Sequence, residues 1–401
     1  MLAQRTSLFK SSGTAAARAA AKAAADAGRE IVDLTAGEIW ADLAPTVRDG
    51  ALAAIHHGVN RYTDTLGLAD LREVLARKVS RETNQLWQAA EIAVTGGAKQ
   101  ALFNAAMVLI DPGDEVIIPA PYWTTFPAQV LVAGGVPVHV DTRDNGHVPT
   151  IEAIERALTP RTRAIVINTP ANPSGAVYGR DILGAIAGIA QARNLWVIFD
   201  ECYGAFVHPP HAHHAIVSVA PEVRSRTVIV NAFSKTLALT GWRIGYMAAP
   251  KPVIEAVKAL QSHTTSNPNV IAQHAVLNHL RYGDGAYEAR LRQQLATARR
   301  QGLNILSGLT ALPQPDAQGG FYFYLDLSAL LQGGSETADD VVNALLAEAG
   351  VATVSGTAFG DPTGLRLSYG LPADMLDKGL TRLVETLSRW GTRPVRTARI
   401  A

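Results

Sequence analysis

The chain has 401 residues with 48% hydrophobic and 18% charged residues, an ordinary globular composition that suits one large domain plus a smaller one. Its formal net charge of +1 gives no general electrostatic reason to expect nucleic acid or an acidic membrane as a partner. The single cysteine, Cys202, excludes an intrachain disulfide and fits a reducing cytoplasm.

The first predicted element is an alanine-rich helix over residues 15–27. Arg18, Lys22 and Asp26 recur along it at helical intervals, which is typical of a helix with one solvated face rather than of a membrane span. The amino terminus has no charged region followed by a long apolar run, so we expect no secretory signal. No apolar stretch elsewhere reaches spanning length. The sequence therefore predicts a soluble protein without a membrane partner.

Residues 90–250 alternate short apolar runs with longer amphipathic segments. The short runs are β-branched and mostly continuous, as in strands buried on both faces, and the segments between them are long enough for helices. Asp111-Pro112-Gly113 ends a helix predicted over Ala98–Ile110. The predicted strands are Ile92–Thr95, Glu115–Pro119, Ala164–Asn168, Trp196–Asp200, Thr227–Asn231 and Ile244–Ala248. This pattern predicts an α/β fold with a mainly parallel sheet flanked by helices.

A second region, from about residue 285 to 390, mixes helices with short strands and predicts a smaller α+β domain. The predicted helices are Glu288–Arg300 and Thr337–Ala349, and the predicted strands are Phe321–Leu327, Val351–Val354 and Leu365–Ser368. The tail after Arg393 has no packing pattern. We expect three parts: an N-terminal arm with part of the small domain (1–44), a large domain (45–284) and a small C-terminal domain (285–401).

The segment most informative about function follows the predicted strand Thr227–Asn231 and reads Ser234-Lys235-Thr236-Leu237-Ala238-Leu239-Thr240-Gly241-Trp242-Arg243-Ile244-Gly245. Lys235 would lie just past a strand's carboxyl end, where open α/β sheets bind ligands. A desolvated lysine has a lowered pKa and becomes a usable nucleophile and base. Arg243 could clamp a phosphate, and Ser234 could add a hydroxyl donor. A surface lysine is the common alternative, which this context disfavours.

This segment resembles the cofactor-lysine signature of the class I and II aminotransferases, which are pyridoxal-5′-phosphate (PLP) enzymes of fold type I. The resemblance covers about residues 12–390 and points toward bacterial aspartate and prephenate aminotransferases. It implies that Lys235 holds PLP as a Schiff base within the large domain. Ala232 departs from the family's usual serine or glycine three residues before the lysine, a position where a phosphate-binding hydroxyl would be lost.

Two further motifs occur in the family's order. Thr95-Gly96-Gly97-Ala98-Lys99-Gln100-Ala101 turns from a strand into a helix, and its free N–H groups and positive dipole end suit a phosphate near Gly97 and Ala98. Such a turn alone serves only geometry in many α/β proteins. In Asn172-Pro173-Ser174-Gly175, the resemblance implies that Asn172 hydrogen-bonds the cofactor's phenolic oxygen and adjoins the substrate. By itself this tetrapeptide would be a turn.

Asp200-Glu201-Cys202-Tyr203 follows the predicted strand Trp196–Asp200. A carboxylate there can pair with the pyridine nitrogen and keep it protonated, which makes the ring an electron sink. The resemblance implies that Tyr203 is a second hydrogen-bond donor to the phenolic oxygen. Taken singly, Asp200 would be an ordinary strand-end acid, but four motifs in order make coincidence a poor explanation. Cys202 is expected to be a buried structural thiol.

The substrate end is implied by two more motifs. Leu365-Arg366-Leu367-Ser368-Tyr369 resembles the family's carboxylate clamp, in which Arg366 would make a bidentate contact to the α-carboxylate; an arginine paired with a surface acid is the alternative. Gly37, in Thr35-Ala36-Gly37-Glu38, would let a backbone approach the same carboxylate. The following Ile39-Trp40-Ala41-Asp42 departs from the family's proline, aspartate and aromatic, so we expect a differently shaped entrance.

The resemblance also assigns aromatic residues. Pro121-Tyr122-Trp123 aligns with the ring that stacks on the cofactor, and we place Trp123 there, with Tyr122 or simple core packing as alternatives. Tyr62, in Asn60-Arg61-Tyr62-Thr63, resembles the tyrosine that reaches the partner subunit's phosphate. The chain is therefore expected to be a homodimer with composite active sites.

Lys99 carries the substrate hypothesis. Aspartate and prephenate aminotransferases of one bacterial subgroup have a similar run, and their lysine contacts the substrate's distal carboxylate. The resemblance thus implies an L-amino acid donor such as aspartate or glutamate, with 2-oxoglutarate or oxaloacetate as the 2-oxo acid acceptor. A solvated or locally ion-paired lysine is an equal alternative.

Other functions remain open. Another fold type I PLP enzyme, such as a carbon–sulfur β-lyase, or an aminotransferase for aromatic or other non-acidic amino acids would carry the same cofactor motifs. A PLP-fold regulator usually has an added DNA-binding domain, for which this chain lacks the length and basic patch. No early G-x-G-x-x-G unit indicates a nicotinamide dehydrogenase. His208, His211, His213 and His214 lack supporting carboxylates or cysteines in sequence, so we expect no metal.

Overall fold

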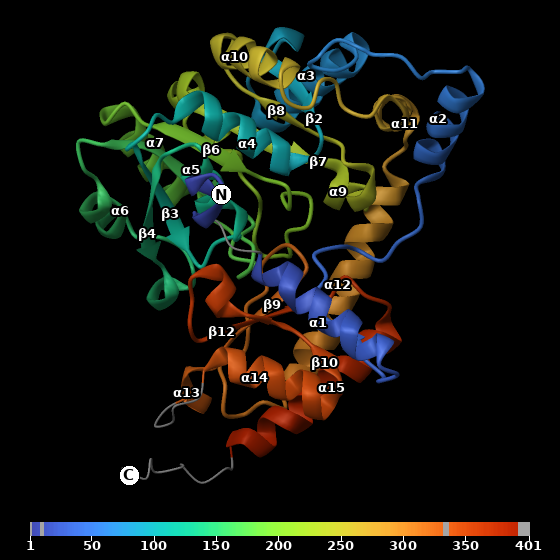
Figure 1. Ribbon diagram of the computed structural model, residues 1–401, viewed down its shortest axis with the longest axis vertical. Helices are drawn as coiled ribbons and strands as arrows, with labels where there is room; N and C mark the ends of the chain where they lie inside the picture. Colours follow the sequence, from blue (N-terminus) through green and yellow to red (C-terminus); the bar gives the residue numbers. More distant parts are fainter. Residues whose placement is uncertain (1, 9–11, 332–336, 392–401) are drawn as a thin grey trace.

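The computed structural model describes residues 2–8, 12–331 and 337–391, so the tail after Arg393 lies outside the described residues. The chain forms a larger unit built on a central sheet and a smaller unit that contains two short sheets (Figure 1). The two units lie one above the other along the long axis, and helix α12 (Ala286–Leu306) runs from the larger to the smaller.

The central sheet has seven strands in the order β2-β8-β7-β6-β5-β3-β4. They are β2 (Ile92–Thr95), β3 (Glu115–Ala120), β4 (Val136–Asp141), β5 (Thr162–Asn168), β6 (Trp196–Asp200), β7 (Thr227–Ala232) and β8 (Gly245–Ala248). All neighbours pair in parallel except β8, which runs antiparallel to β2 and β7. The predicted mainly parallel α/β fold is confirmed.

Within the central sheet, β4 is the strand that the sequence pattern did not predict. It lies at the edge of the sheet, and only one of its residues, Val140, is buried, whereas all six residues of β3 are buried. Solvent reaches most residues of β4, and Pro137 and His139 interrupt its apolar run, so the continuous pattern that identified the other strands is missing here. Strand β2, at the opposite edge, is buried throughout and was predicted.

Helices cover both faces of the central sheet, which is why its strands are apolar without alternation. On β3 and β5, Ile118 and Val166 pack in one core cluster with α4 (Ala98–Leu109), α5 (Thr125–Val132) and α10 (Lys251–Ser262). Their sequence neighbours Ile117 and Ile165 pack in the other cluster. That cluster includes side chains of α3 (Ala69–Thr83), α6 (Ile151–Ala157) and α7 (Arg180–Ala192).

The remaining helices of the larger unit are short or lie at its side. They are α2 (Pro45–His56), α8 (Ile216–Val219), α9 (Phe233–Thr236) and α11 (Val270–Tyr282). Between β7 and β8 the chain has only the single turn α9 and a 3-10 turn at Thr240–Trp242. A parallel crossover normally needs a covering helix, so the chain returns antiparallel at this point.

The smaller unit combines N-terminal and C-terminal segments. Strand β1 (Val32–Asp33) pairs in parallel with β10 (Val351–Ala352), and β11 (Val354–Ser355), β12 (Gly364–Ser368) and β9 (Tyr322–Asp326) form an antiparallel sheet. Its helices are α1 (Gly13–Asp26), α12, α13 (Ser328–Leu331), α14 (Ala338–Ala344) and α15 (Ala373–Gly391). The strand expected over Val351–Val354 is two strands that pair with different partners. The expected helix Thr337–Ala349 is α14 followed by a π-helical turn.

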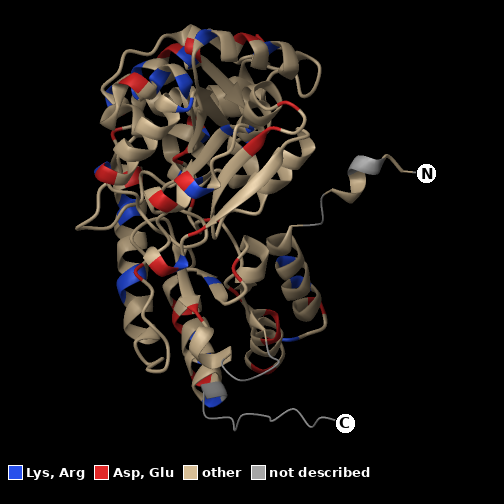
Figure 2. Cartoon of the chain, turned by 90° about the vertical axis from the view of Figure 1, so that its left-hand side faces the viewer, with Lys and Arg blue, Asp and Glu red and all other residues tan. Residues whose placement is uncertain are grey.

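Charges of both signs are interspersed on the face seen in Figure 2, and the N-terminal turn Gln4–Ser7 stands clear of the body of the molecule. Among the described residues, no helix combines the length and apolarity needed to cross a membrane. The domain limits at residues 44 and 284 stay a prediction.

Candidate active site

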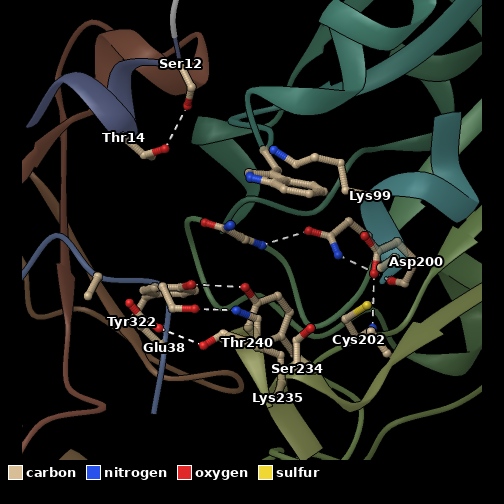
Figure 3. A pocket seen from close by; sticks show the side chains of 18 of the residues that line it. Ser12, Thr14, Glu38, Lys99, Asp200, Cys202, Ser234, Lys235, Thr240 and Tyr322 are labelled. Atoms are coloured by element: carbon tan, nitrogen blue, oxygen red, sulfur yellow. Dashed lines mark hydrogen bonds between the residues drawn. The ribbon is translucent and has the colours of Figure 1, made fainter. Parts of the chain in front are cut away.

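A cavity of about 500 Å³ lies where the carboxyl ends of the central strands meet the smaller unit (Figure 3). The larger unit contributes strand-end residues such as Asn168, Asp200 and Ala232, and the smaller unit contributes Tyr322 and Arg366. Parallel strands present their carboxyl ends at one edge, so residues far apart in sequence converge here. The motifs singled out from the sequence meet at this cavity, with Tyr62 as the exception.

Lys235 lies on the one-turn helix α9, immediately after β7, and its amine donates a hydrogen bond to the carbonyl oxygen of Gly37. The ring centroids of Tyr203 and Phe321 lie 5.8 and 5.6 Å from Nζ. Burial lowers the pKa of Lys235 to about 8, and the nearby arginines act in the same direction. A pKa of about 8 leaves roughly a tenth of the amines neutral at pH 7, far more than for an ordinary lysine, and the neutral amine is the form that a nucleophile or base requires.

Asp200, at the end of β6, is 3% exposed. Its Oδ1 accepts the backbone N–H of Cys202 at 3.0 Å. Burial raises the pKa of Asp200 to about 6 even though this hydrogen bond lowers it. Within the described part of the chain, no arginine, lysine or histidine forms an ion pair with the carboxylate. A buried acid in this state is stabilised by a cationic ligand group that enters the cavity.

Arg243 and the start of helix α4 form an anion-binding corner. Gly97 has φ +86 and precedes α4, and a Cβ there would lie 2.8 Å from Nη2 of Arg243. The guanidinium donates to the carbonyl oxygens of Thr240 at 2.8 Å and Gly96 at 3.2 Å. No described carboxylate pairs with it. The helix N-terminus and the free cation suit a phosphate, and Ala98 and Ser234 line the adjoining wall.

Arg366 is buried, at 2% exposure, and pairs with no carboxylate among the described residues. Its Nη1 donates to Oδ1 of Asn172 at 2.9 Å, and its Nη2 donates to the carbonyl oxygen of Thr35 at 2.7 Å. Its Nε has no hydrogen-bond partner. The guanidinium also lies 4.5 Å from the ring centroid of Tyr322. A buried guanidinium held in place by neutral acceptors is a ready site for a carboxylate.

Of the two neighbouring aromatic residues, Trp123 lines the cavity and Tyr122 does not. Tyr122 stacks on His139, with ring centroids 4.6 Å apart. Nζ of Lys99 lies 5.0 Å from the Trp123 ring and forms no ion pair with any described residue. Burial, and then the charge of Arg243, lower the pKa of Lys99. Lys99 is therefore a cavity cation rather than a locally ion-paired lysine.

Tyr203 and Tyr62 lie in opposite environments. The hydroxyl groups of Tyr203 and Tyr322 are 3.0 Å apart, and both side chains are buried beside Lys235. Tyr62 is 89% exposed and does not line the cavity. Its expected role at a partner subunit stays a prediction.

Several cavity residues escaped prediction from sequence. Glu38 and Thr240 belong to two of the predicted motifs, but the sequence predicted no role for either residue. In the structure, Oε2 of Glu38 accepts a hydrogen bond from the hydroxyl of Thr240 at 2.7 Å. Tyr322 lies in a predicted apolar strand, and nothing in that segment indicated a role in the site. Arg18 was placed on a solvated helix face, yet it lines the cavity and pairs with Glu38 at 2.8 Å.

The histidine cluster makes protein contacts. Nε2 of His208 is 3.0 Å from the hydroxyl of Tyr369, and Nε2 of His213 is 3.1 Å from Oε2 of Glu201. Among the residues that the structure describes, no group of three or more histidine, cysteine, aspartate or glutamate side chains is placed to hold a metal ion.

Known proteins resemble this chain over nearly its whole length. The family model for aminotransferase class I and II matches residues 29–383. The aspartate aminotransferase of Geobacillus stearothermophilus is 38% identical over 390 residues, covering 95% of this chain and 98% of that protein. The aspartate/prephenate aminotransferase of Thermus thermophilus is 40% identical over 393 residues, covering 97% and 99%.

Solved structures of aspartate aminotransferases are also similar to this chain over nearly its whole length. The aspartate aminotransferase from Thermus thermophilus with maleate superimposes with a TM-score of 0.90 at 37% identity, covering 96% of this chain and 99% of that chain. The aspartate aminotransferase from Thermotoga maritima gives a TM-score of 0.88 at 33% identity, over 96% and 100%.

Proposed function

This chain belongs to the class I and II aminotransferase family and is a PLP-dependent transaminase, and we propose that its amino donor is a dicarboxylic amino acid such as aspartate or glutamate. The acceptor would be a dicarboxylic 2-oxo acid, either 2-oxoglutarate or oxaloacetate. The observation that carries this proposal is that, besides Lys235, three basic residues lining the cavity have no acid partner among the described residues: Arg243, Arg366 and Lys99. A phosphate and an α-carboxylate use the two arginines, which leaves Lys99 for a second carboxylate.

The residues present fit PLP. The corner formed by Arg243 and the start of α4 offers an anion site for the phosphate. The raised pKa of Asp200, at about 6, reflects a buried carboxyl that a protonated pyridine nitrogen would stabilise. Trp123 provides a flat wall. Asn172 and Tyr203 would donate to the phenolic oxygen.

The reaction needs a base that can serve the substrate's α-carbon. When bound, PLP supplies an electron sink that stabilises a carbanion at that carbon. Lys235 would take the α-proton and return it at the cofactor's C4′ atom, and its lowered pKa of about 8 leaves the amine able to accept a proton. Asp200 would hold the proton on the pyridine nitrogen throughout.

Residues of both units would orient the substrate. Arg366, which lines the cavity, would bind the α-carboxylate, and Asn172 holds the guanidinium in position. The backbone at Gly37 allows close approach, since a Cβ there would meet the Tyr322 hydroxyl at 2.9 Å. Fixing the α-carboxylate sets the direction in which the α-proton faces Lys235.

We also propose a homodimer with composite active sites. Tyr62 is 89% exposed, although the family resemblance implies that it contacts a phosphate. The exposure would be explained if Tyr62 reached the cavity of a partner subunit. Leu52, Ile55 and Tyr282 are also exposed, at 47, 58 and 71%, on the neighbouring helices α2 and α11. Exposed apolar residues gathered in this way favour a protein interface. A single cysteine supports a cytoplasmic location.

An absorbance spectrum of the PLP-loaded protein tests the function. Adding L-aspartate or L-glutamate should remove the visible band of the lysine-bound cofactor and yield pyridoxamine phosphate, and 2-oxoglutarate or oxaloacetate should restore the band. A band that responds only to aromatic or other non-acidic donors would overturn the dicarboxylic proposal. Release of pyruvate from a cysteine-derived donor without pyridoxamine phosphate would indicate a carbon–sulfur β-lyase instead.

A further inference from the structure

An ion pair between helix α1 and the segment that follows strand β1 lines the cavity. Arg18 projects from α1, whose first residues Thr14 and Ala15 also line the cavity. Its Nη2 lies 2.8 Å from Oε1 of Glu38. The Arg18 side chain is 63% exposed and the Glu38 side chain is 35% exposed. The pair is thus in contact with solvent on one side and with the cavity on the other.

Glu38 is held in place from the opposite side as well. Its second oxygen, Oε2, accepts the Thr240 hydroxyl at 2.7 Å (Figure 3), and Thr240 lies in the segment between Lys235 and Arg243. Burial alone would raise the pKa of Glu38, but the Thr240 hydrogen bond and the charges of Arg18 and Lys235 outweigh it and hold the pKa below its usual value. Glu38 is therefore a carboxylate at neutral pH.

The position of that negative charge bears on substrate binding. Among the described residues that line the cavity, the carboxylates are Asp200 and Glu38. Asp200 is the buried acid at the strand ends, whereas Glu38 follows Gly37, whose carbonyl oxygen contacts the Lys235 amine. Glu38 thus lies beside the reacting amine. An uncompensated carboxylate there would repel a dianionic substrate more strongly than a monocarboxylate.

We propose that Arg18 is a specificity-determining residue, which neutralises Glu38 and thereby lets the cavity accept a substrate with a second carboxylate. The inference rests on the proposed dicarboxylic substrate and adds to it, because Lys99 would attract the second carboxylate while Arg18 removes an opposing charge. Arg18 acts through Glu38 and need not contact the substrate.

Because the ion pair is exposed, an effect of Arg18 on substrate choice can be distinguished from an effect on stability. Exposed ion pairs contribute little to the free energy of unfolding, so Arg18→Gln should leave the fold intact. The same helix offers a matched control one turn on. Lys22 pairs with Asp26 at 2.7 Å, both are exposed, and neither lines the cavity, so Lys22→Gln removes the same charge without approaching it.

The test measures ligand binding to the PLP-loaded protein by calorimetry, with succinate as an unreactive dicarboxylate and propionate as its monocarboxylate counterpart. Arg18→Gln should raise the Kd for succinate about tenfold, the size of one modest charge interaction, and leave that for propionate unchanged. Arg18→Lys should retain most of the parent's preference. The double variant Arg18→Gln/Glu38→Gln should regain succinate binding because the opposing charge is gone, and Lys22→Gln should match the parent.

Each other outcome has one meaning. Equal weakening of succinate and propionate in Arg18→Gln would assign Arg18 a structural role and overturn the inference. A double variant as weak as Arg18→Gln would mean that Arg18 binds the carboxylate directly, which also overturns it. A parent protein that shows no preference for succinate over propionate would overturn the proposed dicarboxylic substrate itself, and this inference with it.

Discussion

The two ends of the cavity are built differently. At the cofactor end, Asp200, Lys235 and Gly97 each adjoin the carboxyl end of a central strand, so the sheet itself positions them. At the substrate end, Arg366 and Glu38 belong to the smaller unit's strands and N-terminal segments, and Arg18 comes from a separate helix. The first end rests on the central sheet, and its charged side chains Asp200, Lys235 and Arg243 have no ion-pair partner among the described residues. The second is assembled from segments that lie far apart in the sequence.

The largest effect we expect is at the cofactor end, from Lys235→Ala. Removing the amine that we assign to moving the α-proton should lower kcat by about 10⁴-fold, the upper range for a positioned proton-transfer group. Steady-state kinetics and the visible spectrum would measure it. Lys251→Ala, which removes an exposed lysine paired with Glu255 at 3.7 Å, is the control and should behave as the parent. Residual activity within tenfold of the parent would contradict the assignment.

Asp200→Asn should reveal that the cofactor end is destabilised when no cofactor is bound. The pKa of Asp200 is about 6 in the folded chain against 3.8 for the ordinary group, so between these values the folded state binds more protons than the unfolded state. Stability at this site therefore falls as pH rises from about 4 to 6, by roughly 3 kcal/mol in total. The variant has no ionisable group at this position, so its free energy of unfolding should not show this fall.

Urea unfolding of the cofactor-free proteins measures this effect. Asp200→Asn and the parent should have similar free energies of unfolding at pH 4, and the variant should be more stable above pH 6. A difference between the two proteins that stays constant from pH 4 to 7 would show that Asp200 is not destabilised by its burial.

The strands differ in how clearly the sequence indicates them. The central strands could be predicted because burial on both faces leaves continuous β-branched runs, and β4 escaped because solvent reaches most of its residues. Among the two-residue strands, β1 was not predicted, and β10 and β11 were predicted as one strand, because pairing across the fold rather than local sequence defines such short elements.

For the site, the predicted residues were those with a local motif. Lys235, Asp200 and Asn172 each follow a strand, so a short segment of sequence is enough to indicate their position. Tyr322 and Arg18 line the cavity only because the smaller unit and α1 fold against the larger unit, and nothing within a helical turn of either residue indicates that contact. Arg18 on its alanine-rich helix has the same local pattern as Lys22, which stays in solvent.

At the substrate end, Arg366→Lys should cost less than the loss of Lys235. A lysine keeps the charge but cannot donate two parallel hydrogen bonds to a carboxylate, so we expect kcat/KM to fall about 10- to 100-fold. The loss should appear with every amino donor, because all carry the α-carboxylate. PLP affinity, measured by dialysis and absorbance, should be retained. A defect in PLP binding as large as the kinetic defect would instead place Arg366 at the cofactor end.

The smallest effect, and the one that separates the two ends most sharply, is expected from Lys99→Gln. Lys99 lies on α4, the helix that begins at the anion corner, yet its amine faces Trp123 and has no acid partner among the described residues. If it serves the second carboxylate, kcat/KM should fall about tenfold with L-aspartate and stay unchanged with L-alanine. An equal loss with both donors, together with weaker PLP binding, would assign Lys99 to the phosphate. The helix α4 would then belong wholly to the cofactor end, and the choice of substrate would rest with the smaller unit alone.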